Sequence, residues 1–167
     1  MLFSSLLIFA CLFATDLITK RVICGVLAET GGRMDFIPRL LRFEYAENTG
    51  MAWGMFKNGT LFLSIVTALA CAAIIFFLIK TGKKMPLPMR LGLLMILAGA
   101  AGNLFDRVFL GFVRDFIAFD FIDFPIFNFA DSCVTIGGIL LFISLVLTKK
   151  GREFFKNLDD EKEKPAK

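Results

Sequence analysis

Four aspartates lie within residues 113–132, a stretch whose other residues are mostly apolar: Asp115, Asp120, Asp123 and Asp131. Acids are costly near hydrocarbon, so carboxylates in such a stretch point to a function. Two carboxylates that meet in a poorly hydrated site share one proton, and the pKa of one of them rises. The ionised member can take a proton from water while the protonated member donates to an amide carbonyl oxygen. A pair formed by Asp115 and Asp131 would therefore hydrolyse a peptide bond by activated water.

These acids also have simpler interpretations. Asp120 and Asp123 alternate with Phe and Ile, and we expect them to be solvent-facing residues of an interfacial loop. Asp131 opens a long apolar run, and an acid in the first turn of a helix is favoured by the helix dipole. Taken alone, Asp131 is explained as well by helix stability as by catalysis.

Several other kinds of chemistry are excluded by composition. The chain has no histidine, which removes a Ser-His-Asp triad, a Cys-His pair and a histidine-based metal site. The four cysteines have no CxxC spacing, so a disulfide framework or a structural zinc site is not expected. A glycine-rich phosphate loop and a basic patch interleaved with aromatic residues are both absent from the sequence, and nucleic-acid binding fits poorly. We therefore expect no cofactor and no metal.

The aspartates must be positioned by apolar elements. The chain of 167 residues is 57% hydrophobic and contains 21 Phe, which makes a water-soluble surface hard to build. A spanning helix needs roughly 20 mostly apolar residues. The windows that qualify are residues 2–18, 60–79, 91–108 and 130–147. We predict an all-α membrane protein with four spans. The first window lacks a basic n-region and a convincing cleavage site, so it is read as a retained span.

Basic residues in the short connections predict the orientation. The segment 80–90 carries four basic residues and no acid, and the tail after the fourth span also begins with basic residues. Both segments should be cytoplasmic, so both termini lie inside and segments 20–59 and 109–129 face outward. Lys20 and Arg21 break this rule, which indicates a local task for these charges or snorkelling at the helix end.

The first outer segment is too long for a structureless connection. Within it, Leu41, Phe43 and Tyr45 alternate with polar or small residues, which predicts a strand in a small extracytoplasmic sheet. Trp53 is expected to anchor at the membrane interface. Residues 1–150 are predicted to form a single membrane domain, and residues 151–167 a charged, solvated cytoplasmic tail without chemistry of its own.

Polar residues gather near the outer ends of the predicted spans: Asp16, Lys20, Asn103, Asp106, Arg107, Asn128 and Asp131. Asp16 and Lys20 are four residues apart on one helix face, so a plain helix-end ion pair explains them as well as a functional role does. Small residues around Gly99 and Gly102 predict that the third span is central, because they allow close helix contacts. The polar end of that span would then point into the bundle.

Five motifs on these spans resemble the lipoprotein signal peptidase family, also called signal peptidase II, of bacterial inner membranes. The motifs occur in the family's order and cover roughly residues 16–137. They are Asp16-x-x-x-Lys20, Asn48-Thr49-Gly50-Met51-Ala52-Trp53-Gly54, Gly99-x-x-Gly102-Asn103-x-x-Asp106-Arg107, Val113-Arg114-Asp115-Phe116 and Phe127-Asn128-Phe129-Ala130-Asp131-Ser132.

The resemblance implies an aspartic endopeptidase with Asp115 and Asp131 as its catalytic acids near the outer membrane surface. Such an enzyme removes signal peptides from prolipoproteins just before a diacylglyceryl-modified cysteine, so lipid-modified prolipoproteins and membrane lipids are the expected partners. We expect a monomer in the bacterial cytoplasmic membrane. The residues expected to bind substrate or support the two acids are Asp16, Lys20, Asn48, Gly50, Asn103, Arg107 and Asn128.

Two positions depart from the family pattern. Met51 stands where the family commonly has Ala, and Ala98 where it commonly has Gly. Met51 is expected to reshape the groove near Asn48. Asp106 belongs to the family pattern and is expected to brace the structure by pairing with a basic group.

The alternative function is a small carboxylate-based proton or cation transporter. Such a transporter should carry polar residues through the full membrane depth, whereas the inner halves of the second to fourth spans are apolar.

Overall fold

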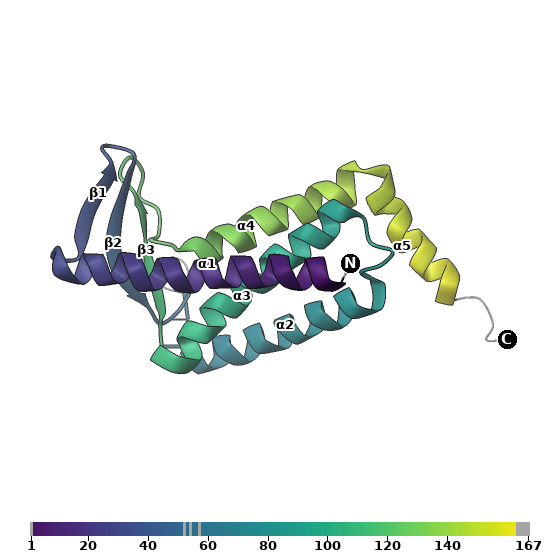
Figure 1. Ribbon diagram of the computed structural model, residues 1–167, viewed down its shortest axis with the longest axis horizontal. Coiled ribbons are helices and arrows are strands. Elements are labelled where there is room, and N and C mark those ends of the chain that lie inside the picture. The colour runs from purple at the N-terminus through teal and green to yellow at the C-terminus, as the bar shows by residue number, and fades with distance from the viewer. Residues whose placement is uncertain (1, 52, 54, 57, 163–167) are drawn as a thin grey trace.

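The computed structural model describes residues 2–51, 53, 55–56 and 58–162. In chain order, its elements are α1 (Leu2–Glu29), β1 (Arg33–Ile37), β2 (Leu41–Asn48), α2 (Thr60–Thr81), α3 (Leu87–Leu110), β3 (Val113–Phe119), α4 (Phe129–Phe142), a π-helical turn (Ile143–Leu147) and α5 (Lys149–Lys162) (Figure 1). Among the described residues, four helical segments are long and apolar enough to cross a membrane: Leu2–Glu29, Thr60–Thr81, Leu87–Leu110 and Phe129–Leu147. The predicted class, an all-α membrane protein with a small sheet, is confirmed.

The first helix is longer than the sequence window suggested. α1 continues through Glu29, because the charge of Lys20, which follows the apolar window, is paired with Asp16 inside the bundle at 2.9 Å. Its 28 residues span about 42 Å at 1.5 Å per residue. A bilayer's hydrocarbon core is about 30 Å thick, so the last turns of α1 extend beyond it, beside the sheet (Figure 1).

The three strands form an antiparallel sheet in the order β1-β2-β3. The alternation that predicted a strand falls in β2, which is the central strand. β2 joins the first outer segment to the segment before α4, with Phe43 opposite Ile117 and Ala46 opposite Asp115. An irregularity between Phe43 and Ala46 shifts the register there. The pairing fixes the backbone of Asp115 at the sheet end of the bundle.

Small residues bring α3 close to its neighbours. A Cβ added at Gly99 would collide with the carbonyl oxygen of Ala130 in α4, and one at Gly102 would collide with the Asp16 carboxylate of α1. On the same α3–α4 interface, nearer the α2–α3 connection, Gly92 and Gly137 face each other's carbonyl oxygens. These contacts confirm that the third span is central.

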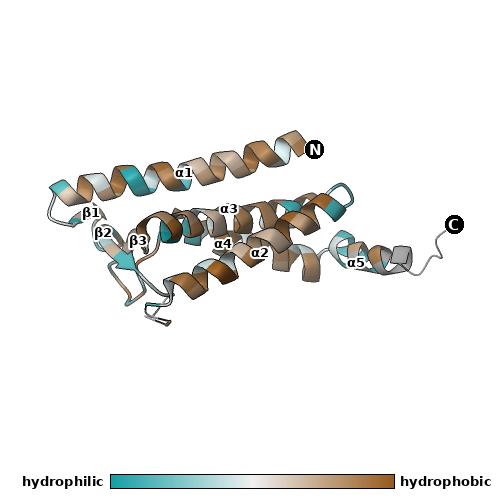
Figure 2. Cartoon of the chain, turned by 90° about the horizontal axis from the view of Figure 1, so that it is seen from below, coloured by the Kyte–Doolittle hydropathy of each residue, from teal (hydrophilic) through white to brown (hydrophobic). Residues whose placement is uncertain are grey.

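α1 is attached to the bundle differently. It lies to one side of the group formed by α2, α3 and α4 (Figure 2), and its buried residues are Asp16, Lys20 and Leu27. Most of its apolar side chains are exposed in the isolated protein, as suits a helix that faces lipid. Polar contacts therefore fix the position of α1 more than apolar packing does.

The end of the chain differs from the expected solvated tail. Residues 149–162 form α5, and Phe154 is only 5% exposed because it packs against Met85, Met89 and Leu93 at the α2–α3 end of the bundle. The segment carries enough apolar surface on one face to dock. Its charged residues obscured this face in the sequence.

Candidate active site

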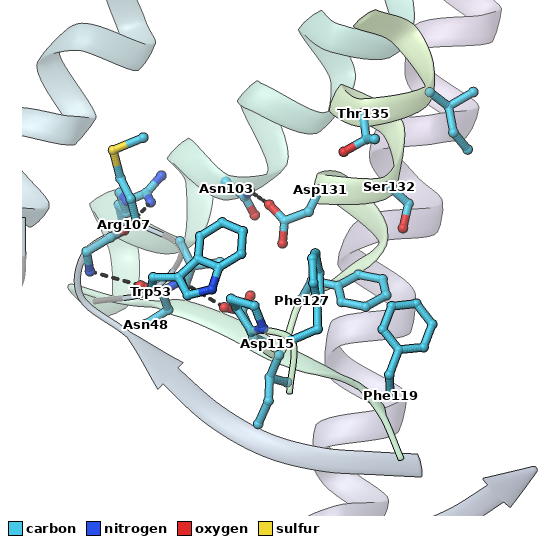
Figure 3. Close-up of a pocket in the computed structure, with 17 residues that line it drawn as sticks. Asn48, Trp53, Asn103, Arg107, Asp115, Phe119, Phe127, Asp131, Ser132 and Thr135 are labelled. Atoms are coloured by element: carbon cyan, nitrogen blue, oxygen red, sulfur yellow. Dashed lines mark hydrogen bonds between the residues drawn. The ribbon is translucent and has the colours of Figure 1, made fainter. Parts of the chain in front are cut away.

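A cavity of about 580 Å³ opens at the sheet end of the bundle, between α3, α4, β3 and the segment after β2 (Figure 3). Its polar lining consists of Asn48, Asn103, Arg107, Asp115, Asp131, Ser132 and Thr135. Its apolar lining includes Met51, Trp53, Val113, Phe119, Phe124, Phe127 and Ile136. Six of the nine expected site residues line this cavity, including Gly50. The other three, Asp16, Lys20 and Asn128, are buried behind it.

Asp115 lies on β3 and is 2% exposed. Its Oδ2 accepts a hydrogen bond from Asn48 Nδ2 at 2.9 Å, and its Oδ1 accepts one from Asn128 Nδ2 at 2.7 Å. Burial and, to a smaller extent, the nearby charge of Asp131 together raise the pKa of Asp115 to about 7, against the lowering effect of the two hydrogen bonds. Asp115 is therefore half protonated near neutral pH.

Asp131 occupies the first turn of α4. Its Oδ1 accepts a hydrogen bond from Asn103 Nδ2 at 2.8 Å, and its Oδ2 accepts one from the backbone N–H of Asn128 at 3.0 Å. Asn128 Oδ1 accepts in return from the backbone N–H of Asp131 at 3.0 Å, which completes a capping box. Asp131 thus stabilises the start of α4 and also lines the cavity.

Asn128 connects the two acids. Its side-chain N–H donates to Asp115 while its backbone N–H donates to Asp131. The residue is completely buried and also donates to Asn103 Oδ1 at 3.1 Å. Because one asparagine holds both carboxylates, the spacing of three residues between Asn128 and Asp131 sets the geometry of the pair.

Lys20 anchors the shell behind the cavity. Its ammonium group is fully buried and contacts Asp16 Oδ2 at 2.9 Å, Asn103 Oδ1 at 2.9 Å and Asp106 Oδ2 at 3.4 Å. Of these three groups, Asn103 Oδ1 accepts a hydrogen bond from the ammonium, and the two carboxylates are ion-pair partners. Since Asn103 Oδ1 faces Lys20, its Nδ2 is directed to Asp131. The lysine thereby orients a group that contacts the second acid.

Asp16 connects the same shell to α4. Its Oδ1 accepts a hydrogen bond at 3.0 Å from the backbone N–H of Ala130, which lies in the first turn of that helix. Asp16 is 1% exposed and Lys20 is fully buried. The pair is therefore buried behind the cavity and is not a surface ion pair at a helix end.

Arg107 and Gly50 hold the segment after β2. Arg107 Nη2 donates to the carbonyl oxygen of Gly50 at 3.0 Å, and the N–H of Gly50 donates to Asn48 Oδ1 at 2.9 Å. This directs Asn48 Nδ2 toward Asp115. A Cβ at Gly50 would collide with the carbonyl oxygen of Met55, so the tight turn requires glycine.

Asp106 braces the structure, as expected from its motif. It is fully buried and accepts hydrogen bonds from the Arg114 backbone N–H at 3.1 Å, Nε at 3.2 Å and Nη2 at 2.7 Å. The hydrogen bonds to Asp106 raise the pKa of Arg114. This pair fixes the start of β3, one residue before Asp115.

The other two aspartates lie apart from the pair. Asp120 was expected to face solvent, and this prediction is wrong. It is 18% exposed and forms an ion pair with Arg42 at 2.5 Å that closes the end of the sheet. Asp123 is exposed, as expected, and lines an adjoining cavity of about 580 Å³ together with Arg42 and Asn48.

Some lining residues were not singled out by the sequence. Ser132 and Thr135 follow Asp131 by one and four residues on α4, and this spacing was the available signal for Thr135. Trp53 was assigned to the membrane interface alone. Its ring packs edge-on against Phe124 at 5.7 Å, and both residues line the cavity.

The sequence of the chain is similar to those of known proteins. Residues 8–147 match the family described as signal peptidase (SPase) II. The chain belongs to the signal peptidase II family. It is 42% identical over 127 residues to a lipoprotein signal peptidase of Enterococcus faecalis, covering 76% of this chain and 78% of the relative. A lipoprotein signal peptidase of Staphylococcus aureus is 36% identical over 166 residues, covering 98% and 95% respectively.

Solved structures agree with this assignment. One, described as a bacterial membrane enzyme, superposes with a TM-score of 0.76 at 35% identity, covering 98% of this chain and 94% of the other. A second with the same description gives a TM-score of 0.74 at 37% identity, covering 86% and 92%. Family membership and the four apolar helices identify the chain as a peptidase, a hydrolase that crosses the bacterial cytoplasmic membrane several times.

Proposed function

We propose that this signal peptidase II family member is an aspartic endopeptidase that removes signal peptides from prolipoproteins. It cleaves before a diacylglyceryl-modified cysteine and uses Asp115 and Asp131 as the catalytic acids. One observation carries the proposal: two carboxylates from β3 and α4 line a single cavity and are joined through Asn128.

The chemistry follows from the protonation of the pair. At neutral pH, Asp115 is partly protonated because its pKa is raised to about 7. Asp131 accepts hydrogen bonds from Asn103 and Asn128 and acts as the base. It takes a proton from water as the water oxygen attacks the scissile carbonyl carbon, and Asp115 gives its proton to the carbonyl oxygen. The tetrahedral diol then collapses: Asp115 takes back a proton from one hydroxyl as the carbonyl re-forms, Asp131 gives its proton to the leaving nitrogen, and the C–N bond breaks, which returns both acids to their starting state.

The apolar lining suits a lipid-modified substrate. Phe119, Phe124 and Ile136 form an apolar wall beside the two acids. A diacylglyceryl group packed on this wall would hold the scissile bond near the headgroup level.

The polar residues proposed to support catalysis form two groups. In the first group, Asn48, Asn103 and Asn128 orient the two acids.

The second group supports the shell. Arg107 holds the Gly50 segment, which closes over one side of the cavity, and Asp16 with Lys20 ties α1 to the other side. We further propose that both termini are cytoplasmic, that the cavity faces outward and that the enzyme acts as a monomer.

The test compares cleavage of a lipid-modified prolipoprotein with cleavage of the same protein lacking the lipid. The wild-type protein in detergent should cleave the modified substrate selectively. Asp115→Asn and Asp131→Asn should each lower turnover by about 10⁴-fold, because neither amide can exchange the required proton. Thermal unfolding and helix content by circular dichroism establish that each variant is folded. Full activity in either folded variant would refute the assignment.

A matched control uses Asp123→Asn, which changes an exposed acid of the same outer segment. This variant should retain wild-type turnover. A transporter would instead give ion flux in liposomes without cleavage, and the two readouts separate the alternatives.

A further inference from the structure

A third cavity, of about 410 Å³, lies between the last turns of α1 and the sheet. Two arginines line it, Arg21 from α1 and Arg114 from β3, together with Cys24 and Tyr45. None of the residues proposed for catalysis lines this cavity. It is therefore a separate feature of the outer end of the molecule.

The position of the cavity along α1 places it at the expected level of lipid headgroups when the hydrocarbon core begins near Leu2. Arg21 is about 29 Å along α1 from Leu2 at 1.5 Å per residue, close to the thickness of the hydrocarbon core, about 30 Å. The orientation rule left Lys20 and Arg21 unexplained, because basic residues are favoured on the cytoplasmic side. The buried contacts of Lys20 account for that residue. Arg21 has no such explanation.

Charge makes the cavity suitable for an anion. Arg21 is exposed, and no carboxylate within the described part of the chain lies within ion-pair distance of it. Arg114 also lines the cavity, and Asp106 accepts hydrogen bonds from its Nε and Nη2. The nearby acid Glu47 accepts a hydrogen bond from Tyr45 and lines the cavity that contains Asp123, not the one that contains Arg21. Guanidinium groups bind phosphate oxygens through paired N–H donors.

The shape of the cavity suits a lipid in particular. Its α1 wall carries the small residues Gly25 and Ala28, and a Cβ at Gly25 would meet no atom within 4 Å. On the adjacent stripe of α1, Ile18 and Val22 are 59% and 56% exposed. A headgroup in the cavity would therefore place its acyl chains along an apolar face that already points to the membrane.

We propose that this cavity binds the headgroup of an anionic phospholipid of the outer leaflet, with Arg21 and Arg114 contacting the phosphodiester. The site is independent of the peptidase reaction, so it can be tested whether or not the proposed catalytic acids are correct.

Cys24 provides the readout, because it lines the cavity and is partly exposed. In maltoside micelles free of phospholipid, the alkylation rate of Cys24 by a small maleimide is followed by mass spectrometry of the peptide. Phosphatidylglycerol should slow this reaction in a saturable way. Arg21→Gln should weaken the apparent affinity about tenfold, the loss expected for one charge-assisted contact. Arg21→Lys should recover part of the effect.

Arg33→Gln is the matched control, since Arg33 is a 60% exposed basic residue of the same outer region that does not line the cavity. It should leave phosphatidylglycerol protection unchanged. Three results would overturn the proposal. They are equal protection by diacylglycerol, which lacks the phosphate; equal protection by inorganic phosphate, which lacks the lipid; and phosphatidylglycerol protection that is unaffected by Arg21→Gln.

Discussion

Single residues in this protein combine structural and chemical tasks. Asn128 caps α4 through its side-chain oxygen and contacts both acids through its N–H groups. Lys20 would be very costly to bury alone, but the carboxylates of Asp16 and Asp106 compensate its charge, and its hydrogen bond fixes Asn103. The geometry of the two carboxylates is thus set by amide groups that are themselves held in one orientation.

Asn128→Ser separates these two tasks. Serine is a good N-cap, so the helix start should be retained. The donor to Asp115 is lost, and we expect turnover to fall about a hundredfold because the acid is misplaced. The check is turnover per folded molecule together with the midpoint of thermal unfolding. A midpoint that falls in proportion to activity would show that the residue acts only through stability.

The pKa of Asp115 predicts how stability depends on pH. Because its pKa rises from 3.8 in the unfolded chain to about 7 in the folded protein, the folded state binds more protons between these values. The free energy of unfolding contributed by Asp115 therefore decreases as pH rises from about 4 to about 7. Asp115→Asn removes this dependence. The difference in unfolding midpoint, variant minus wild type, should therefore be more positive at pH 8 than at pH 4. An unchanged difference between these pH values would contradict the raised pKa.

At the scale of elements, close contacts between helices set the position of the site. Gly102 allows the Asp16 carboxylate to approach α3, and Gly99 allows α3 to approach the first turn of α4. Each contact brings a polar group to the back of the cavity. Small residues therefore control both packing and the geometry of the acids.

Substitution of these glycines tests the contacts. Gly102→Ala and Gly99→Ala should each destabilise the protein by about 1–3 kcal/mol, because the added methyl group collides with polar atoms that cannot move freely. Gly138→Ala is the matched control, since a Cβ at Gly138 would meet no atom within 4 Å. It should be neutral or slightly stabilising, as alanine favours the helix. Chemical or thermal unfolding in detergent measures the three variants.

The sequence predicted elements better than it predicted their ends and their contacts. Apolar windows identified every span, but hydropathy stopped the first one at its charged residues, whose partners lie on α3. Spacing grouped Asn128 with Asp131, since a helix start is local. The pairing of Asp120 with Arg42 joins residues 78 positions apart, which no local pattern reveals. The docking of Phe154 on Met85 and Met89 was missed for the same reason.

At the scale of the whole molecule, polarity is divided between two ends. The sheet, the cavity and the buried charges lie at one end, and the basic α2–α3 connection and α5 lie at the other (Figure 2). The apolar middle separates them. Such a division suits a reaction on a substrate held at one membrane surface.

Cysteine labelling in intact cells tests the orientation. In a background with the native cysteines replaced by serine, Asp35→Cys should react with a membrane-impermeant maleimide, because β1 is expected outside. Lys83→Cys, which is also exposed, should react only after the cells are opened. The reverse pattern would place the cavity on the cytoplasmic side and exclude the proposed substrate geometry.

The attachment of α1 through buried charges has a consequence for biosynthesis. Asp16 and Lys20 lie on α1, which is synthesised before α3 and α4. The backbone N–H that donates to Asp16 belongs to Ala130, in the first turn of α4. The charges must remain without these partners until translation has produced both α3 and α4. A nascent or truncated chain therefore lacks a complete set of supports for its acids, and hydrolysis begins only when the whole bundle has assembled.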